Sequence, residues 1–225
     1  PLICEAFGWP TFAGTLSGRV PALTFRDGDL RAGGDVEAVV FAGKVVGSNL
    51  RLQDPFGRWP RLFADVRARD LDLAAVTNTF AFGSITGRLE ADVLGLELFA
   101  WSPVAFDARL ATPTGDRSKK RISAKAVGNL SNIGGGGGGV IAALQSGFLR
   151  FFDVFGYSKL GLKCQLRDGV CLMSGIEPAR NGGYYIVKGS GIPRIDIIGN
   201  AGRVDWPRLV SQISAGIEAE SVEVR

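Results

Sequence analysis

The chain is 225 residues long, carries 26 Lys and Arg against 22 Asp and Glu, and contains no histidine. This length suits one large domain or two small ones with a sizeable core. Without histidine, Ser/His and Cys/His nucleophilic sites are excluded and the commonest metal ligand is missing, so we expect neither an enzyme nor a cofactor. The net charge of +4 keeps anionic lipid and nucleic acid open as partners.

Short runs of alternating apolar and polar residues fill the chain from Gly14 to Thr112. Such alternation predicts strands with one apolar and one polar face. Turn sequences such as Asp54-Pro55-Phe56-Gly57 separate the runs and predict an antiparallel meander. A short helix is expected over residues 71–79, with Asp70 as its cap.

The fold expected from this pattern is mainly β, with a long antiparallel sheet and a few helices. A one-faced sheet with open edges must curl or be covered, and curling encloses the apolar face in an open hydrophobic groove, a half-pipe. Ordinary core packing is the alternative explanation for apolar strand positions. The residues predicted to line the groove are Leu89, Val93, Leu96, Leu98, Phe106 and Leu110.

The chain changes character between Arg117 and Tyr157. A basic stretch with apolar residues at helical spacing runs into six glycines at 134–139, and then into an almost entirely apolar stretch. Because glycine costs roughly 0.8 to 1 kcal/mol per residue in a helix, the glycines predict a hinge inside a helical insert over about 117–156. The two helices either pack wholly on the sheet or leave an apolar surface free for binding. The second helix is too short to cross a membrane, and it carries Phe148, Phe151, Phe152 and Phe155.

Cys164 and Cys171 flank an Asp168-Gly169 pair, a strong hairpin signal that predicts a cysteine hairpin over about 160–175. The hairpin places both sulfurs on adjacent strands, so a disulfide and two buried thiols are both consistent with the spacing. A final helix is expected to begin after Asp205, its N-cap, and to continue through Gln212.

Several segments together resemble a known family. They are DPFG at 54–57, LDLAAVTNTFAFGSITGRLEADVLGLELFAWSPVAFDARLAT, RISAKAVGNLSNIGG, FFDVFGYSKLGLKCQLRDGVCLMSG and GIPRIDIIGNAGRVDWPRLV. From about Gly14 to Val210 the chain is similar to the C-terminal region of the AsmA-like proteins, particularly the YdbH-like branch. The resemblance implies that residues 1–225 are a C-terminal fragment of a larger β-groove protein. Such a protein crosses the periplasm of a Gram-negative cell envelope and is anchored to the inner membrane through a segment outside this chain.

The same resemblance implies a bridge that conducts phospholipid between the inner and outer membranes through its groove. An acyl chain needs only a continuous apolar lining, worth about 0.8 kcal/mol per buried methylene. The Phe-rich helix would cap the groove or dip into the inner leaflet of the outer membrane, and Lys119, Lys120 and Arg121 would contact lipid phosphates. A solvated charged face is the plainer alternative for the basic stretch. Nucleic acid is not expected, because aromatic residues are not interleaved with these basic ones.

The alternative function is a structural or partner-docking envelope module that carries no lipid. In YdbH-like proteins the C-terminal end is expected to engage a small lipoprotein by strand addition. Here Ser221 to Arg225 alternates Val222 and Val224 with charged residues, as an edge strand would. A carbohydrate enzyme built on the sheet would instead need clustered acids in a polar cleft.

Overall fold

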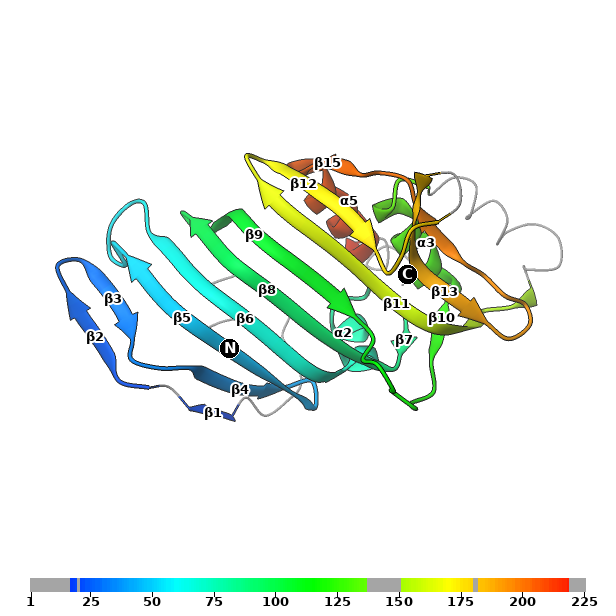
Figure 1. Ribbon diagram of the computed structural model, residues 1–225, viewed down its shortest axis with the longest axis horizontal. Coiled ribbons are helices and arrows are strands. Elements are labelled where there is room, and N and C mark those ends of the chain that lie inside the picture. The colour runs from blue at the N-terminus through cyan, green and yellow to red at the C-terminus, as the bar shows by residue number, and fades with distance from the viewer. Residues whose placement is uncertain (1–16, 20, 137–150, 180–181, 219–225) are drawn as a thin grey trace, which may run out of the picture.

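The computed structural model describes residues 17–19, 21–136, 151–179 and 182–218 (Figure 1). Strands account for 54% of the described residues, and three described helices accompany them. The strands described here form one antiparallel sheet of fifteen members that does not close on itself. The predicted fold class, a mainly β protein with a curled open sheet and a C-terminal helix, is therefore confirmed.

The first half of the chain builds the meander that the alternating runs predict. Its elements are β1 (Ser17–Arg19), β2 (Leu23–Arg26), β3 (Asp29–Ala32), β4 (Val36–Val40), β5 (Gly43–Gln53), β6 (Arg61–Asp72), α2 (Leu73–Thr79), β7 (Ile85–Thr86), β8 (Arg88–Phe99) and β9 (Ser102–Ala111). The strands pair antiparallel in the order β4-β5-β6-β8-β9, and β2 and β3 extend the sheet beside β5.

The second half of the chain continues the sheet beyond β9 and adds the other two helices. Its elements are β10 (Arg121–Ser123), α3 (Ala124–Ile133), β11 (Val154–Arg167), β12 (Val170–Gly175), β13 (Tyr184–Ser190), β14 (Ile197–Gly199), β15 (Arg203–Asp205) and α5 (Trp206–Glu218). The long strand β11 pairs with β9 on one side and with β12 and β13 on the other. Figure 1 shows the long strands following one another along the longest axis of the molecule.

Cross-strand register sorts the side chains of the sheet into two faces. Direct partners on adjacent strands form the apolar row Phe25, Leu30, Leu52, Leu62 and Leu98. A second row on the same face is Val36, Gly47, Val66, Val93, Ala108 and Cys164. The alternate positions carry charged side chains, among them Arg51, Arg67, Asp92, Arg109 and Lys163. Since side chains alternate along a strand, the sheet has one apolar face and one charged face.

A bulge in β8 keeps this separation while it bends the strand. The register of β8 shifts at Gly95, whose φ of 57° lies in the left-handed region that suits glycine. As a result Leu94 lies on the charged face and Leu96 on the apolar face, although residues two apart normally share a face. The carboxylate of Asp65 holds the bulge, accepting 2.7 Å hydrogen bonds from the Gly95 N–H and from Asn49 Nδ2. These two bonds, first that from Gly95, lower the pKa of Asp65.

The caps of two helices test the sequence expectations directly. Helix α2 is capped by Asp72, which accepts a 3.0 Å hydrogen bond from the Ala75 N–H, so the prediction of Asp70 as the cap is wrong. Strand β6 continues to Asp72, and Asp70 occupies a bulge in it with a left-handed φ of 57°. Asp205 caps α5 as predicted, because it accepts a 3.0 Å bond from the Arg208 N–H. Helix α5 continues past Gln212 to Glu218.

The predicted helical insert is only partly helical. Helix α3 starts after its N-cap Ser123, so Ile122, expected in the same helix, lies instead in β10. Strand β11 begins at Val154, so the prediction of a helix reaching Phe155 is wrong. The reason is pairing: Phe155 is the direct antiparallel partner of Ile122, and both side chains are buried. The rest of the expected second helix, residues 137–150, lies outside the described residues.

The buried core lies under the second half of the sheet, where α2, α3 and α5 cover the apolar face (Figure 1). Val127 in α3, Leu166 in β11 and Ile186 in β13 are completely inaccessible to solvent. In β2, β3, β4 and β5, by contrast, no apolar side chain is buried. The apolar face of the sheet therefore has a covered half and an uncovered half.

Candidate functional site

The candidate site is the uncovered half of the apolar face. The apolar row crosses β3, β5, β6 and β8 with half-buried leucines, and it ends at Phe25 in β2, which is 55% exposed. With about 4.8 Å between neighbouring strands, the row is roughly 19 Å long. It runs across the strands and so along the longest axis of the molecule (Figure 1). An apolar surface of this kind, continuous and within reach of solvent, is a candidate binding surface.

The structure divides the six predicted lining residues between two environments. All six lie on the apolar face, as their cross-strand partners show. Leu89 and Phe106 are buried in the core, and Phe106 meets Trp206 of α5 edge to face with ring centroids 5.3 Å apart. For these two residues the ordinary core alternative is correct, because a ligand on the apolar face cannot reach them. The four that remain accessible are Val93, Leu96, Leu98 and Leu110.

Four residues of the apolar row were not among the predicted lining residues: Phe25, Leu30, Leu52 and Leu62. Their strands show the same alternation as the strands that were selected. The sequence signal therefore existed, but alternation reports which side chains share a face and not which part of that face the helices cover. The missing information was the docking position of α2, α3 and α5.

The three basic residues expected to contact lipid phosphates have different environments. Lys119 and Arg121 are exposed, whereas the Lys120 side chain is only 12% exposed. Lys120 Nζ donates to the main-chain oxygen of Asp116 at 2.6 Å and lies 3.0 Å from its carboxylate. Burial alone would raise the pKa of Asp116, but hydrogen bonds from Ser118 and Lys120 outweigh burial and lower that pKa to about 2. Lys120 thus holds its own loop in place. Of the three residues, Lys119 and Arg121 have the exposed side chains that the predicted phosphate contact requires.

The phenylalanines expected on a lipid-facing helix are also divided. Phe151 is 70% exposed, and Phe152 packs partly buried against the core. Phe155 is 1% exposed, so it is a core residue rather than a lipid contact. Phe148 lies outside the described residues. Phe151 is therefore the one member of this set, among those described, that presents most of its ring to solvent.

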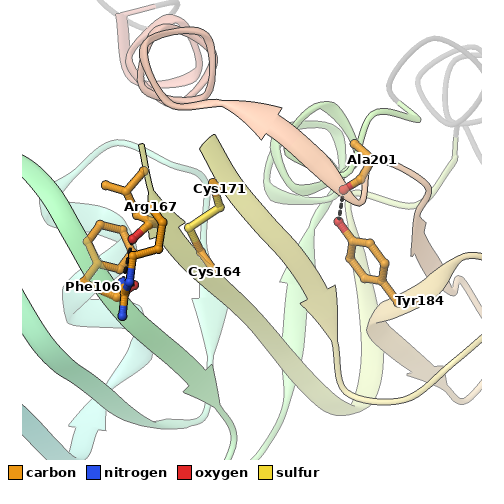
Figure 2. The surroundings of a disulfide bond; sticks show 7 residues. Phe106, Cys164, Arg167, Cys171, Tyr184 and Ala201 are labelled. Carbon is orange, nitrogen blue, oxygen red and sulfur yellow. Dashed lines mark hydrogen bonds between the residues drawn. A yellow bond between two sulfur atoms is a disulfide. The ribbon is translucent and has the colours of Figure 1, made fainter. Parts of the chain in front are cut away.

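Cys164 and Cys171 form a disulfide between β11 and β12, with their Cα atoms 5.5 Å apart (Figure 2). Of the two alternatives that the spacing left open, the structure has the disulfide. Beside it, Arg167 Nη1 donates a 2.9 Å hydrogen bond to the main-chain oxygen of Phe106 (Figure 2). This contact joins β11 to β9 near the ends of the two strands where Trp206 of α5 packs against Phe106.

Two stacked aromatic rings, each with an arginine beside it, lie on the charged face at the turns of two hairpins. Trp59 and Phe99 are stacked, with ring centroids 5.8 Å apart and planes within 7° of parallel. Arg58 lies over Trp59 and Arg61 over Phe99, each 5.4 Å from the ring centroid. Trp59 remains 55% exposed. The fold thus interleaves aromatic and basic side chains here, which the basic stretch at 117–125 does not, while the absence of nucleic acid stays a prediction.

The part of the chain that is described contains no group of three or more Cys, Asp or Glu residues that could hold a metal ion. None of its helices has the length and apolar character needed to span a membrane.

The fold and the candidate site define an open, one-faced β-sheet protein whose apolar side is half covered by helices. The chain matches no family model, no curated protein and no solved structure. The resemblance to AsmA-like proteins therefore stays an expectation, and the site itself supports only what can bind to it.

Proposed function

We propose that the protein binds phospholipid acyl chains on the uncovered half of its apolar face and conducts them between the inner and outer membranes of a Gram-negative envelope. The observation that carries the proposal is the apolar row from Phe25 to Leu98, none of whose members is buried. Folding normally removes such side chains from water, so five adjacent strands that leave them accessible indicate an absent apolar partner.

An acyl chain fits the chemistry of this surface. The backbone N–H and C=O groups of the strands bond to neighbouring strands, so the face presents mainly side chains to a ligand. Neither the apolar row nor the second row contains a charged residue that would interrupt an apolar chain. Each methylene buried against such a surface contributes about 0.8 kcal/mol without requiring a specific contact. A chain held in this way can slide along the rows, and its head group can stay in water on the open side.

The disulfide between Cys164 and Cys171 supports a periplasmic location. Disulfides form and persist in oxidising compartments such as the bacterial periplasm and are rare in the cytosol. The inner-membrane anchor and the bridging role rest on the family resemblance alone.

Native mass spectrometry of protein purified from a Gram-negative host tests the proposal. We expect phospholipid to co-purify with the wild type and to be lost in Leu98→Asn, which places an amide in the apolar row. Leu94→Asn is the matched control, because Leu94 lies on the same strand but on the charged face and is 40% exposed. A folded wild type free of lipid, or equal lipid in the two variants, would contradict the proposal.

A partner-docking module is the second candidate, and the edge strand β2 favours it. Among the described strands, β2 pairs with β3 alone, and its Leu23 and Phe25 are 50% and 55% exposed. An open edge with exposed apolar side chains can accept a strand from another chain. The segment 221–225, which the sequence suggests as an edge, lies outside the described residues. A lipid-free wild type that binds a small envelope lipoprotein, and loses it on Phe25→Asp, would favour docking over lipid transport.

A further inference from the structure

A pocket of about 360 Å³ lies on the charged face of the sheet, between the loop at 112–116 and strand β11. Gly161 forms part of its floor, where an added Cβ would lie only 3.0 Å from the main-chain oxygen of Leu110 and 3.3 Å from Ile176 Cγ1. Cationic side chains of β9 and β11 line the pocket: Arg109, Lys159 and Lys163. Arg109 and Lys163 alternate with Leu110 and Leu162, so the two cationic side chains lie on the face opposite to the acyl-chain site, while Leu110 and Leu162 also border the pocket.

Two of these cations face each other without a partner. Arg109 and Lys163 are direct cross-strand neighbours, an arrangement that brings like charges together and destabilises a sheet. Neither forms an ion pair or a side-chain hydrogen bond with the described residues. Asp92, which opposes Arg109 on the other side, is bound by Arg69 at 2.5 Å. The sheet therefore holds two exposed, like-charged neighbours that form no ion pair with the described residues.

The remaining charges of the pocket strengthen this imbalance. Asp116 is the one carboxylate in the lining, and it is engaged by Lys120 and Ser118. Lys159 opposes Lys188 in the register between β11 and β13, and Lys188 is itself paired with Glu177. Four cationic side chains against one carboxylate give the lining a net charge of +3.

We propose that this pocket binds a small phosphate-bearing ligand, a phosphomonoester or phosphodiester such as a glycerol phosphate group. Arg109 offers a planar fork that matches phosphate oxygens, and Lys159 and Lys163 add point charges around the same volume. An anion between Arg109 and Lys163 converts their repulsion into two attractive contacts. The volume is at the small end of the range for ligand sites, which suits one phosphate ester rather than a polymer. The inference is independent of the acyl-chain site.

Isothermal titration calorimetry with sn-glycerol 3-phosphate tests the site, with glycerol and potassium chloride of equal ionic strength as blanks. The wild type should bind, and Arg109→Gln and Lys163→Gln should each weaken binding about tenfold or more, because each removes a charge-assisted bond. Arg203→Gln makes the same change of charge at an exposed position in β15 and should bind like the wild type. Leu98→Asn should also bind normally, which separates failure of this proposal from failure of the proposed function.

Vesicle co-sedimentation distinguishes the two sources of the phosphate ester. Binding to phosphatidylglycerol vesicles but not to phosphatidylcholine vesicles, lost in Lys163→Gln, assigns the site to a lipid head group. Binding of free glycerol phosphate alone assigns it to a soluble ligand. A wild type that binds neither probe, or pocket variants that bind as the wild type does, would overturn the proposal.

The melting temperature of the ligand-free protein distinguishes a cation that binds a ligand from a cation that stabilises the fold. Lys163→Gln should melt at the same temperature as the wild type or at a higher one, because it removes the repulsion from Arg109. Glycerol phosphate should raise the melting temperature of the wild type and not that of the variant. A lower melting temperature of ligand-free Lys163→Gln would show that Lys163 stabilises the fold by itself, and would overturn the proposal.

Discussion

The two halves of the sheet share one sequence pattern and differ in what covers it. Leu166 in β11 and Leu52 in β5 both lie on the apolar face of a long antiparallel strand. Leu166 is completely buried, whereas Leu52 is only half-buried. The difference arises because Leu166 belongs to the core beneath the helices, whereas β5 reaches that core through Val45, near the end opposite to Leu52. An amphipathic strand thus defines an apolar face, and the packing of other elements decides whether that face is core or binding surface.

This difference predicts where the free energy of folding comes from. In the covered half, apolar burial contributes about 25 cal/mol per Å² removed from water. In the uncovered half much of that contribution is missing, so the proposed acyl-chain ligand should stabilise the protein by mass action. The following substitutions test the comparison, from the largest expected effect to the smallest.

Leu166→Ala should lower the free energy of unfolding by about 3 to 5 kcal/mol, because it opens a cavity in the covered half. Leu52→Ala makes the same change in the uncovered half and should cost about 1 kcal/mol or less, since solvent already reaches that side chain. Urea denaturation of both variants measures the difference. Equal losses would mean that the uncovered half is packed as tightly as the covered half.

Replacing both Cys164 and Cys171 by Ala should cost about 2 kcal/mol. The disulfide closes a short loop with a sequence separation of 7. Because the stabilisation by a disulfide grows with the length of the loop it closes, we expect a free energy at the low end of the usual range. Thermal unfolding with and without a reductant measures the effect. A reductant should lower the melting temperature of the wild type and leave that of the double variant unchanged. An identical response of the two proteins would contradict a disulfide in the native state.

Asp65→Ala should cost about 1 to 2 kcal/mol, because it removes the acceptor of two hydrogen bonds that hold the bulge at Gly95. The pKa of Asp65 is lower in the folded protein, so its contribution is present above about pH 4 and is lost as the pH falls through that lowered pKa. Chemical denaturation at pH 7 and at pH 2.5 should therefore show a smaller gap between wild type and variant at the lower pH.

Asp35→Ala is the matched control, because Asp35 is exposed. It should leave the free energy of unfolding within about 0.5 kcal/mol of the wild-type value. A gap for Asp65→Ala that stays constant with pH would show that the carboxylate charge does not hold the bulge.

Asp92→Asn should have the smallest effect, about 0.5 kcal/mol or less. Asp92 pairs with Arg69 on the charged face, and both side chains are partly exposed, so solvent screens the interaction. The difference from wild type should shrink further at 1 M salt. A loss of several kcal/mol would mean that the charged face stabilises the sheet as strongly as the covered core does.

The sequence predicted the elements that depend on local chemistry. The meander, the Asp168-Gly169 hairpin and the cap at Asp205 follow from alternation, turn residues and capping, and the structure has all three. Tertiary pairing decided the places where prediction failed. Phe155 has helical spacing with its neighbours, yet it forms a strand because Ile122 offers it a buried partner.

The candidate sites depend on positions that are distant in the sequence. Lys120 reads as a free basic residue, and only the fold of the loop at 116–120 shows that Asp116 engages it. Arg109 and Lys163 are 54 positions apart in the sequence, and only the register of β9 and β11 makes them cross-strand neighbours. No local pattern reports such a pairing, so the cation-lined pocket could not be predicted from the sequence.

The bulge at Gly95 allows the curvature of the sheet and the composition of its faces to vary separately. Gly95 is an extra residue in an otherwise strict alternation, so deleting it would straighten β8 and still leave Leu96 and Leu98 on the apolar face. Deleting Ala91 instead would turn Asp92 toward the apolar side. Length changes in this strand are therefore tolerable at one position and disruptive at its neighbours, and a change at Gly95 would alter the curvature of the sheet without altering which side chains lie on its apolar face.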